Sequence, residues 1–264
     1  MKIREAAVAG SFYPGEKTLI LTQLKEFFAK IPKTKKVNCI IAPHAGYAYS
    51  GKTAAIAFSA LKKTKTIFVL SPNHTGLGNP ISVSDADYWE TPLGKIAVDL
   101  RMRNKLLEKL GIGMDDLAHI QEHSLEVQIP FIQFLFPKAK IVPITIMTHR
   151  INELEKLGSA IWSIGGNEVG VVASSDFSHF IPEQEAKKQD KEAIKLIEKL
   201  DYTGFHALVM EKNLSICGFA PIIATMCFCE KNGLKKARLL KYTTSASTTK
   251  DKSSVVGYAA IFFE

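Results

Sequence analysis

"CIIAPHAGYAYSGKTAAIAF", residues 39–58, is the stretch that decides the fold class. An apolar run ends at Pro43, His44 follows at once, and two glycines lead into a second run of small and apolar residues. This order is typical of a buried strand, a loop and a helix. Similar Ile- and Val-rich runs recur at 66–72, 140–147 and 168–175, and helical patterns occupy 16–30, 51–61, 99–110, 150–164 and 182–200.

The apolar runs alternate little between apolar and polar residues, as expected for strands that are buried on both faces. Strands that alternate with helices predict an α/β fold, with a mostly parallel or mixed central sheet flanked by helices. Residues 81–99 predict a β-ribbon that turns at 92–94, and 237–245 and 253–263 predict two closing strands. No break in composition divides the chain, so we expect residues 1–264 to form a single domain.

Composition excludes several classes of partner. The net charge is +8, yet the basic residues are mostly Lys and no aromatic residues interleave with the Lys runs. This pattern favours a solvated surface over a nucleic-acid groove, so we expect no nucleic-acid partner. No apolar run reaches the length of a membrane helix, and the start lacks a signal-peptide core, so we expect a cytoplasmic protein with no membrane partner. Four cysteines in 264 residues do not indicate a disulfide scaffold.

Two short patterns suggest other functions. Residues 46–53, "GYAYSGKT", fit the phosphate-loop pattern, but Tyr47 and Tyr49 would give such a loop a bulky lining. Its glycines are better interpreted as a turn from strand to helix. Residues 119–123, "HIQEH", fit the inverted zinc-protease pattern, in which both histidines would hold Zn with Glu122 as base. Both patterns are short enough to arise by chance.

A distributed site explains more of the sequence. His44, His74 and the pair Asp176 and His179 each follow an apolar run, and Cys217 lies where Gly218 and Pro221 open a helix. In open α/β sheets, ligands bind beyond the carboxyl ends of the strands. Two imidazoles and one anionic ligand leave open positions on a metal, and a helix N-terminus would favour the thiolate of Cys217.

The chain resembles the Memo family, whose microbial members are also called AmmeMemoRadiSam system protein B. The resemblance covers nearly the whole chain through seven motifs in order: "AGSFYP" (9–14), "APHAGYAYSG" (42–51), "LSPNHTG" (70–76), "WETPLGKIAVD" (89–99), "EHSLEVQIPF" (122–131), "SSDFSHF" (174–180) and "CGFAPI" (217–222). The family is similar in fold to the class III extradiol dioxygenases, which use non-haem Fe(II). The resemblance therefore implies a fold of that type.

The resemblance also implies a site. The family's metal ligands fall on His44, His74 and Cys217, and the histidine in the place of the dioxygenases' general base falls on His179. The dioxygenases have Glu where this chain has Cys217, which puts ring cleavage in doubt. Fe(II) is the metal we expect, with Cu or Zn as alternatives.

We expect the remaining site residues to serve the base and the substrate. Asp176 would orient His179. Substrate would contact an aromatic pocket and a polar pair that also supports the metal ligands: Phe12, Tyr13, Tyr47, Tyr49, Glu122 and His123.

The predicted function is therefore a metal-binding protein with a dioxygenase-type site, which would act as a metal-dependent oxidoreductase. The alternative is a non-catalytic module that binds a peptide or a small molecule in the same cleft, beside a radical-SAM system protein. The sequence does not identify the substrate.

Overall fold

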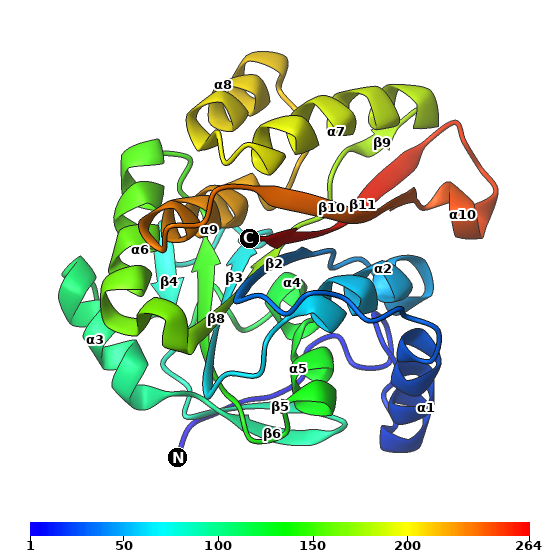
Figure 1. The fold of residues 1–264 in the computed structure, drawn as a ribbon. Coiled ribbons are helices and arrows are strands. Elements are labelled where there is room, and N and C mark those ends of the chain that lie inside the picture. The colour runs from blue at the N-terminus through cyan, green and yellow to red at the C-terminus, as the bar shows by residue number, and fades with distance from the viewer.

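A mixed sheet forms the centre of the molecule (Figure 1). The strands of the computed structural model, which describes residues 1–264, are β1 (Ile3–Arg4), β2 (Cys39–Ala42), β3 (Thr66–Pro72), β4 (Ile81–Val83), β5 (Tyr88–Thr91), β6 (Gly94–Ala97), β7 (Lys140–Ile146), β8 (Val169–Ser174), β9 (His179–Ile181), β10 (Ala237–Thr244) and β11 (Val255–Phe263). The sheet has the order β10-β11-β2-β8-β3-β7-β4, and β9 pairs with β11 beside this path. Strands β2, β8, β3 and β7 are parallel, while β11, β10 and β4 are antiparallel to their neighbours.

Helices cover both faces of this sheet (Figure 1). One face packs against α1 (Lys17–Phe28), α2 (Tyr47–Ala60), α4 (His123–Glu126) and α5 (Ile129–Leu135). The other packs against α3 (Leu100–Leu110), α6 (Ile151–Gly165), α7 (Glu183–Glu198), α8 (Tyr202–Lys212) and α9 (Phe219–Lys231). A short helix, α10 (Ala246–Thr249), lies between β10 and β11. The α/β class with a mixed, helix-flanked sheet is confirmed.

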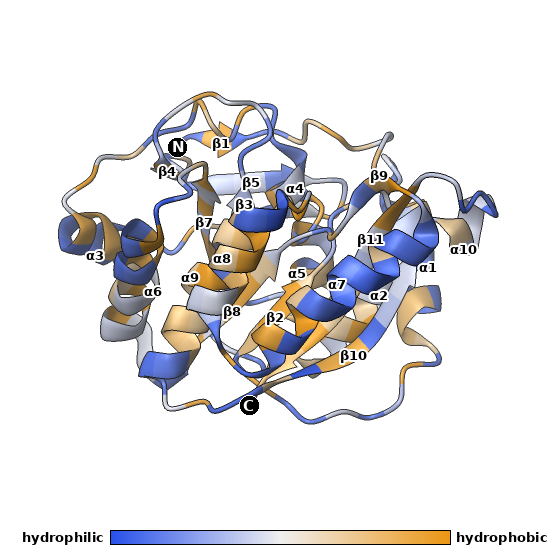
Figure 2. Cartoon of the chain, turned by 90° about the horizontal axis from the view of Figure 1, so that it is seen from above, coloured by the Kyte–Doolittle hydropathy of each residue, from blue (hydrophilic) through white to orange (hydrophobic).

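The alternation of side chains along each strand explains why the runs read as continuously apolar. In β2, Cys39 and Ile41 belong to the core on the α9 side, while Ile40 and Ala42 belong to the core on the α2 side. Successive residues of a strand point to opposite faces, so a strand covered on both sides has no position for an exposed side chain. Figure 2 shows the result, with hydrophobic inner strands and a hydrophilic outer surface on α7.

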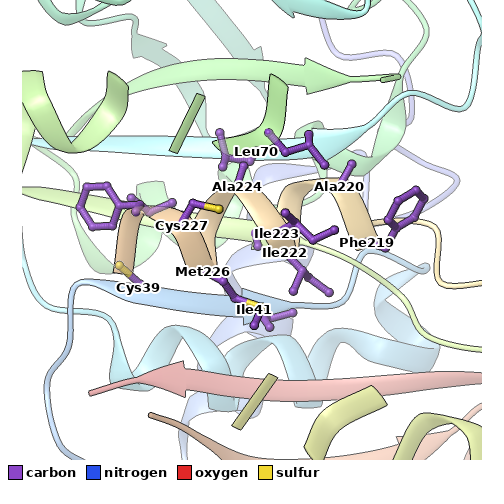
Figure 3. Close-up of a cluster of buried hydrophobic side chains, with 14 of the residues drawn as sticks. Cys39, Ile41, Leu70, Phe219, Ala220, Ile222, Ile223, Ala224, Met226 and Cys227 are labelled. Carbon is purple, nitrogen blue, oxygen red and sulfur yellow. The ribbon is translucent and has the colours of Figure 1, made fainter. Parts of the chain in front are cut away.

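Helix α9 is the most deeply buried helix, and its position matters for the site because Cys217 lies just before it. Most of its side chains are buried. Figure 3 shows Ala224 beside Leu70 of β3 and Met226 beside Ile41 of β2. Helix α6 approaches α9 closely at Gly158, where a Cβ atom would lie 2.3 Å from the carbonyl oxygen of Ala224. This close packing of α9 therefore fixes the position of its first turn relative to the sheet.

Several details differ from the sequence-based expectations. The β-ribbon is confirmed as β5 and β6, but it joins β1 in a separate three-stranded sheet. Helix α2 begins at Tyr47, four residues before the expected start, because Gly51 is a helix residue that faces the Phe27 ring of α1. Residues 81–83, the start of the expected ribbon, form β4 and pair with β7 in the main sheet. Helices α5, α8 and α10 and strands β1 and β9 were not predicted. No helix combines the length and apolar character that crossing a membrane requires.

Candidate functional site

Two strand ends and the start of one helix bring three metal-ligating side chains together. His44 follows β2, His74 follows β3, and Cys217 precedes α9. Their ligand atoms all lie within 4.8 Å of one another, and His44 Nε2 lies 3.1 Å from Cys217 Sγ. Because β2 and β3 run in the same direction in the sheet, their carboxyl ends open at the same edge. The distributed cluster predicted from the strand ends therefore exists as a geometric group.

Gly218 allows Cys217 to reach the cluster. A Cβ atom at Gly218 would lie 2.4 Å from the carbonyl oxygen of Ser174 and 2.4 Å from the Cβ atom of Ser175. These are backbone and near-backbone atoms, so any larger residue would push the start of α9 away from the end of β8. The Gly218 N–H also donates a hydrogen bond to Ser175 Oγ at 3.2 Å.

Hydrogen bonds set the tautomer of His44. Ser174 Oγ donates its single proton to the carbonyl oxygen of Ser124 at 2.7 Å. The same oxygen lies 2.9 Å from His44 Nδ1 and accepts a hydrogen bond from Gln128 Nε2 at 2.8 Å. His44 Nδ1 must therefore carry the proton and donate it to Ser174. Burial lowers the pKa of His44 well below its usual value, so Nε2 presents a free lone pair toward Cys217.

Glu122 sets the tautomer of His74. Its side chain is fully buried, and it accepts hydrogen bonds from His74 Nδ1 at 2.8 Å, from the His74 backbone N–H at 2.5 Å, and from both the backbone N–H and the hydroxyl of Ser124. Burial alone would raise the pKa of Glu122, but these hydrogen bonds outweigh it and lower the pKa to about 2. The ionised carboxylate accepts the His74 Nδ1 proton and leaves Nε2 free. Glu122 therefore supports His74, as expected, and its complete burial leaves no exposed surface for the expected substrate contact.

The protonation state of the Cys217 thiol differs from the thiolate that the sequence predicted. Burial raises the pKa of Cys217 well above its usual value, and the nearby carboxyl of Asp176 raises it further. The first turn of α9 was expected to lower this pKa, but burial has the larger effect. In the metal-free chain the thiol is protonated and lies against the free lone pair of His44. A metal ion that binds here must displace that proton.

His179 is oriented by a different residue from the one expected. Its Nδ1 lies 2.7 Å from the carbonyl oxygen of Ser215, and its backbone N–H donates to Ser215 Oγ at 2.8 Å. A carbonyl oxygen only accepts, so Nδ1 carries the proton and Nε2 is the basic atom. Asp176 makes no hydrogen bond to His179, and the prediction that it orients this ring is wrong.

Asp176 instead supports the loop that carries His44. Its Oδ1 atom accepts a hydrogen bond from the backbone N–H of His44 at 2.8 Å. Burial raises the pKa of Asp176 to about 6, against the opposing effect of that hydrogen bond. Asp176 therefore fixes the position at which His44 leaves β2.

The predicted aromatic pocket divides into two groups. Tyr13 and Tyr47 are each 3% exposed, and their hydroxyls donate to Glu126 and to the carbonyl oxygen of Val127. They are core residues rather than pocket lining, because the first turn of α2 directs Tyr47 into the layer below the site. Tyr49 is 45% exposed and remains available.

Phe12 and His123 form one edge of the metal-ligand cluster. The Phe12 ring packs against the ring of His123, with centroids 4.5 Å apart. His123 in turn stacks on His74 at 4.7 Å. Burial lowers the pKa of His123 to about 4, so its ring is neutral at physiological pH.

The structure excludes both short patterns as functional motifs. Residues 47–53 are already helical, and Lys52 is an exposed residue on α2 rather than part of a loop. His119 precedes α4 and is fully buried, with Nδ1 3.1 Å from Thr145 Oγ1 and Nε2 3.2 Å from the carbonyl oxygen of Ser82. His119 and His123 therefore do not share a helix face, and the zinc-protease interpretation is wrong.

Three supporting residues were not identified from the sequence: Ser174, Gln128 and Ser215. Ser174 and Gln128 determine the tautomer of His44, and Ser215 determines that of His179. Ser174 lies in the "SSDFSH" segment that marked this strand end, so its position carried a signal. Gln128 and Ser215 are ordinary polar residues in the sequence, and only the fold brings them to the histidines.

Comparison with known proteins shows the family to which the chain belongs. The model of the Memo-like protein family matches residues 4–262. A MEMO1 family protein of Methanosarcina mazei is 39% identical over the full length of both chains. One from Sulfurisphaera tokodaii is 41% identical over 99% of each chain, and one from Aquifex aeolicus is 37% identical over 100% of each.

Among solved structures, an uncharacterized protein from Escherichia coli K12 has a similar fold. Its TM-score is 0.57 at 13% identity, and the match covers 85% of this chain and 98% of that one. At this identity the likeness concerns the fold alone, whereas the family model matches residues 4–262 and the archaeal and bacterial relatives cover 99–100% of the chain. The chain belongs to the Memo-like family.

Proposed function

We propose that this protein binds one metal ion through His44 Nε2, His74 Nε2 and Cys217 Sγ. The observation that carries the proposal is the preset tautomer of both histidines. Each Nδ1 proton is held by a buried acceptor, Ser174 for His44 and Glu122 for His74, so each Nε2 lone pair faces the cluster. Metal-binding histidines typically donate their second ring N–H to such an acceptor.

The donor set suits several metals. Two neutral imidazoles and one thiolate supply a single negative charge and leave positions open for substrate, which is the arrangement of non-haem Fe(II) sites with a softer third ligand. We propose Fe(II), with Cu and Zn as the alternatives that this donor set accepts. When bound, iron or copper would supply one-electron or Lewis-acid chemistry to a ligand in the open positions.

The chain's own residues supply the remaining functions. His179 is partly exposed and has a basic Nε2, so it accepts a proton from an acidic hydroxyl of the substrate. The Phe12 and His123 rings give the site an aromatic edge. We therefore propose an oxidoreductase that acts on a small molecule whose hydroxyl is deprotonated at His179.

Exposed aromatic side chains favour a second candidate function. Phe180, next to His179, is 76% exposed, and Tyr49 is 45% exposed. Such groups suit the binding of a peptide or a small molecule without turnover. A partnership with a radical-SAM system protein rests on the family resemblance alone and stays a prediction.

Metal content tests the first proposal. Protein produced without a metal-binding tag is loaded anaerobically with Fe(II) or Cu(I), desalted and measured by elemental analysis. We expect about one ion per chain for the wild type and a large loss for His44→Ala and for Cys217→Ser. His206→Ala and Cys227→Ala are matched controls, because both residues lie outside the cluster. Equal metal content in all five proteins would refute the ligand assignment.

Turnover separates the two candidate functions. Oxygen uptake is followed after Fe(II)-loaded protein is mixed with catechol and other phenols. Uptake that requires His179 supports the oxidoreductase. Tight binding of the phenol without oxygen uptake, measured by calorimetry on the same sample, supports the binding module.

A further inference from the structure

A groove lined by basic residues lies at the edge of the sheet opposite the metal-ligand cluster. It consists of two concavities, of about 770 Å³ and 470 Å³, that meet at Phe136, Lys138, Ala139 and Lys140. Its floor lies at the first residues of β3, β7 and β8, whereas His44 and His74 follow the last residues of β2 and β3. We call this surface the basic groove, and eight cationic residues line it: Lys17, Lys62, Lys63, Lys65, Lys95, Arg101, Lys138 and Lys140.

These eight charges lack partners within the protein. None of them makes an ion pair, whereas Lys, Arg and N-terminal cations elsewhere in the molecule form ten ion pairs. Only two acidic residues line the groove. One of them, Asp99, already accepts hydrogen bonds from the N–H of Met102 and from the hydroxyl of Thr66. Clustered like charges repel one another and raise the local concentration of anions.

Arg101 adds a second indication. It lies in the first turn of α3, where the partial positive charge of the helix N-terminus disfavours a cation. The fold places it in the same concavity as Lys62 and Lys63, and it forms no ion pair with a carboxylate. Arrangements that lower the stability of the free protein are typical of surfaces that gain energy when a partner binds.

The lining distinguishes between anionic partners. The smaller concavity contains Leu21, Leu93 and Phe134 among its lysines and has no acidic residue. Apolar side chains between cations suit a segment that alternates acidic and apolar residues. The aromatic residues that line the groove, Tyr88, Phe134 and Phe136, are half-buried or buried. Seven of its eight cations are Lys, whereas nucleic-acid grooves use Arg and exposed aromatic rings.

We propose that the basic groove is the docking site for an acidic, partly apolar segment of another protein. The site is separate from the metal-ligand cluster, so the proposal does not depend on the proposed function. Lys138 and Lys140 are the central contacts, because both concavities include them.

Fluorescence anisotropy with a defined probe tests the proposal. The probe is a fluorescein-labelled peptide in which pairs of glutamates alternate with single leucines, and its control has glutamine at each glutamate. The variant Lys138→Glu/Lys140→Glu reverses two exposed charges in the groove. The control variant Lys188→Glu/Lys191→Glu makes the same charge change on the outer surface of α7, where neither lysine forms an ion pair. Thermal unfolding checks that all three proteins are folded.

The expected result is binding of the acidic peptide by the wild type at physiological salt, with about a tenfold or greater loss in the groove variant. The control variant should bind within about twofold of the wild type, because its charges lie outside the groove. Equal losses in both variants would mean bulk attraction and would overturn the proposal, as would no binding by the wild type. Tighter binding of a thymidine oligonucleotide, lost in the groove variant, would overturn it in favour of nucleic acid.

Discussion

Replacing Glu122 with glutamine tests the reasoning about the metal-ligand cluster most directly. The carboxylate Oε1 accepts from His74 Nδ1 and from Ser124, while Oε2 accepts from the backbone N–H of His74. Glutamine has one oxygen in place of two, so its NH₂ group must face one of these donors. One buried donor then loses its acceptor, and the remaining hydrogen bonds lose the assistance of the charge.

Two arguments give similar magnitudes for the loss in unfolding free energy caused by Glu122→Gln. A buried donor left without an acceptor costs about 1–3 kcal/mol, and weaker hydrogen bonds add to that loss. The pKa of Glu122 falls from its usual value of 4.5 to about 2, which at about 1.4 kcal/mol per pKa unit corresponds to about 3 kcal/mol in favour of the ionised form. We therefore expect Glu122→Gln to lower the free energy of unfolding of the metal-free protein by about 3 kcal/mol.

The same change should weaken metal binding. Without the carboxylate, the His74 ring is free to rotate and to change tautomer, and such losses typically cost about tenfold to a hundredfold in metal affinity. Urea unfolding of metal-free protein and anaerobic competition titration with Fe(II) measure the two effects. Glu198→Gln is the matched control, since Glu198 accepts only from the N–H of Leu239 and lies away from the cluster. Unchanged stability and unchanged affinity in Glu122→Gln would refute the reasoning.

Three further predictions concern Gly218, Asp190 and His179. Gly218→Ala should lower both unfolding free energy, by about 2 kcal/mol or more, and metal affinity, because its Cβ atom meets backbone at 2.4 Å. Gly113→Ala is the control: a Cβ atom there would have no atom within 4 Å, so neither the unfolding free energy nor the metal affinity should change. Calorimetry measures both quantities. Burial raises the pKa of Asp190, so the folded protein holds that proton more tightly than the unfolded chain does. The stability of the wild type relative to Asp190→Asn should therefore fall as the pH rises through the raised pKa and stay level above it; a pH-independent difference in urea unfolding would contradict this. His179→Ala should keep the metal content of the wild type, since its ring is outside the cluster, and a loss of metal in elemental analysis would make it a ligand.

The sequence predicts the fold well where burial controls the residue pattern. Strands β2, β3, β7 and β8 appear as Ile- and Val-rich runs, and each is found within three residues of the expected bounds. The start of α2 was misplaced because Gly51 reads as a breaker in a sequence. In the structure it is a contact point, where the absence of a side chain lets α1 approach.

The sequence predicted which candidate ligand residues lie together, but not the residues that support them. His44 and His74 mark strand ends that share an edge, so topology alone brings them together. The partner of His179 depends on which loop passes beside it, and Ser215 contributes a backbone carbonyl that any residue could have supplied. The burial of Tyr47 depends on how α2 is rotated about its axis. Buried residues occur on most sides of this helix, so the sequence pattern does not reveal that rotation.

The long sequence separation within the cluster has a consequence for how the protein is made. His44 and Cys217 are 173 residues apart, and β11, which pairs with β2 through Ile261 and Ile41, is synthesised later still. During translation, β2 therefore lacks β11 as a neighbour until nearly all 264 residues have been synthesised. Contacts between such distant segments form slowly, so a nascent chain exposes the edge of β2 for most of its synthesis. Under the proposed function, capture of a metal ion by all three side chains is therefore an event that follows translation.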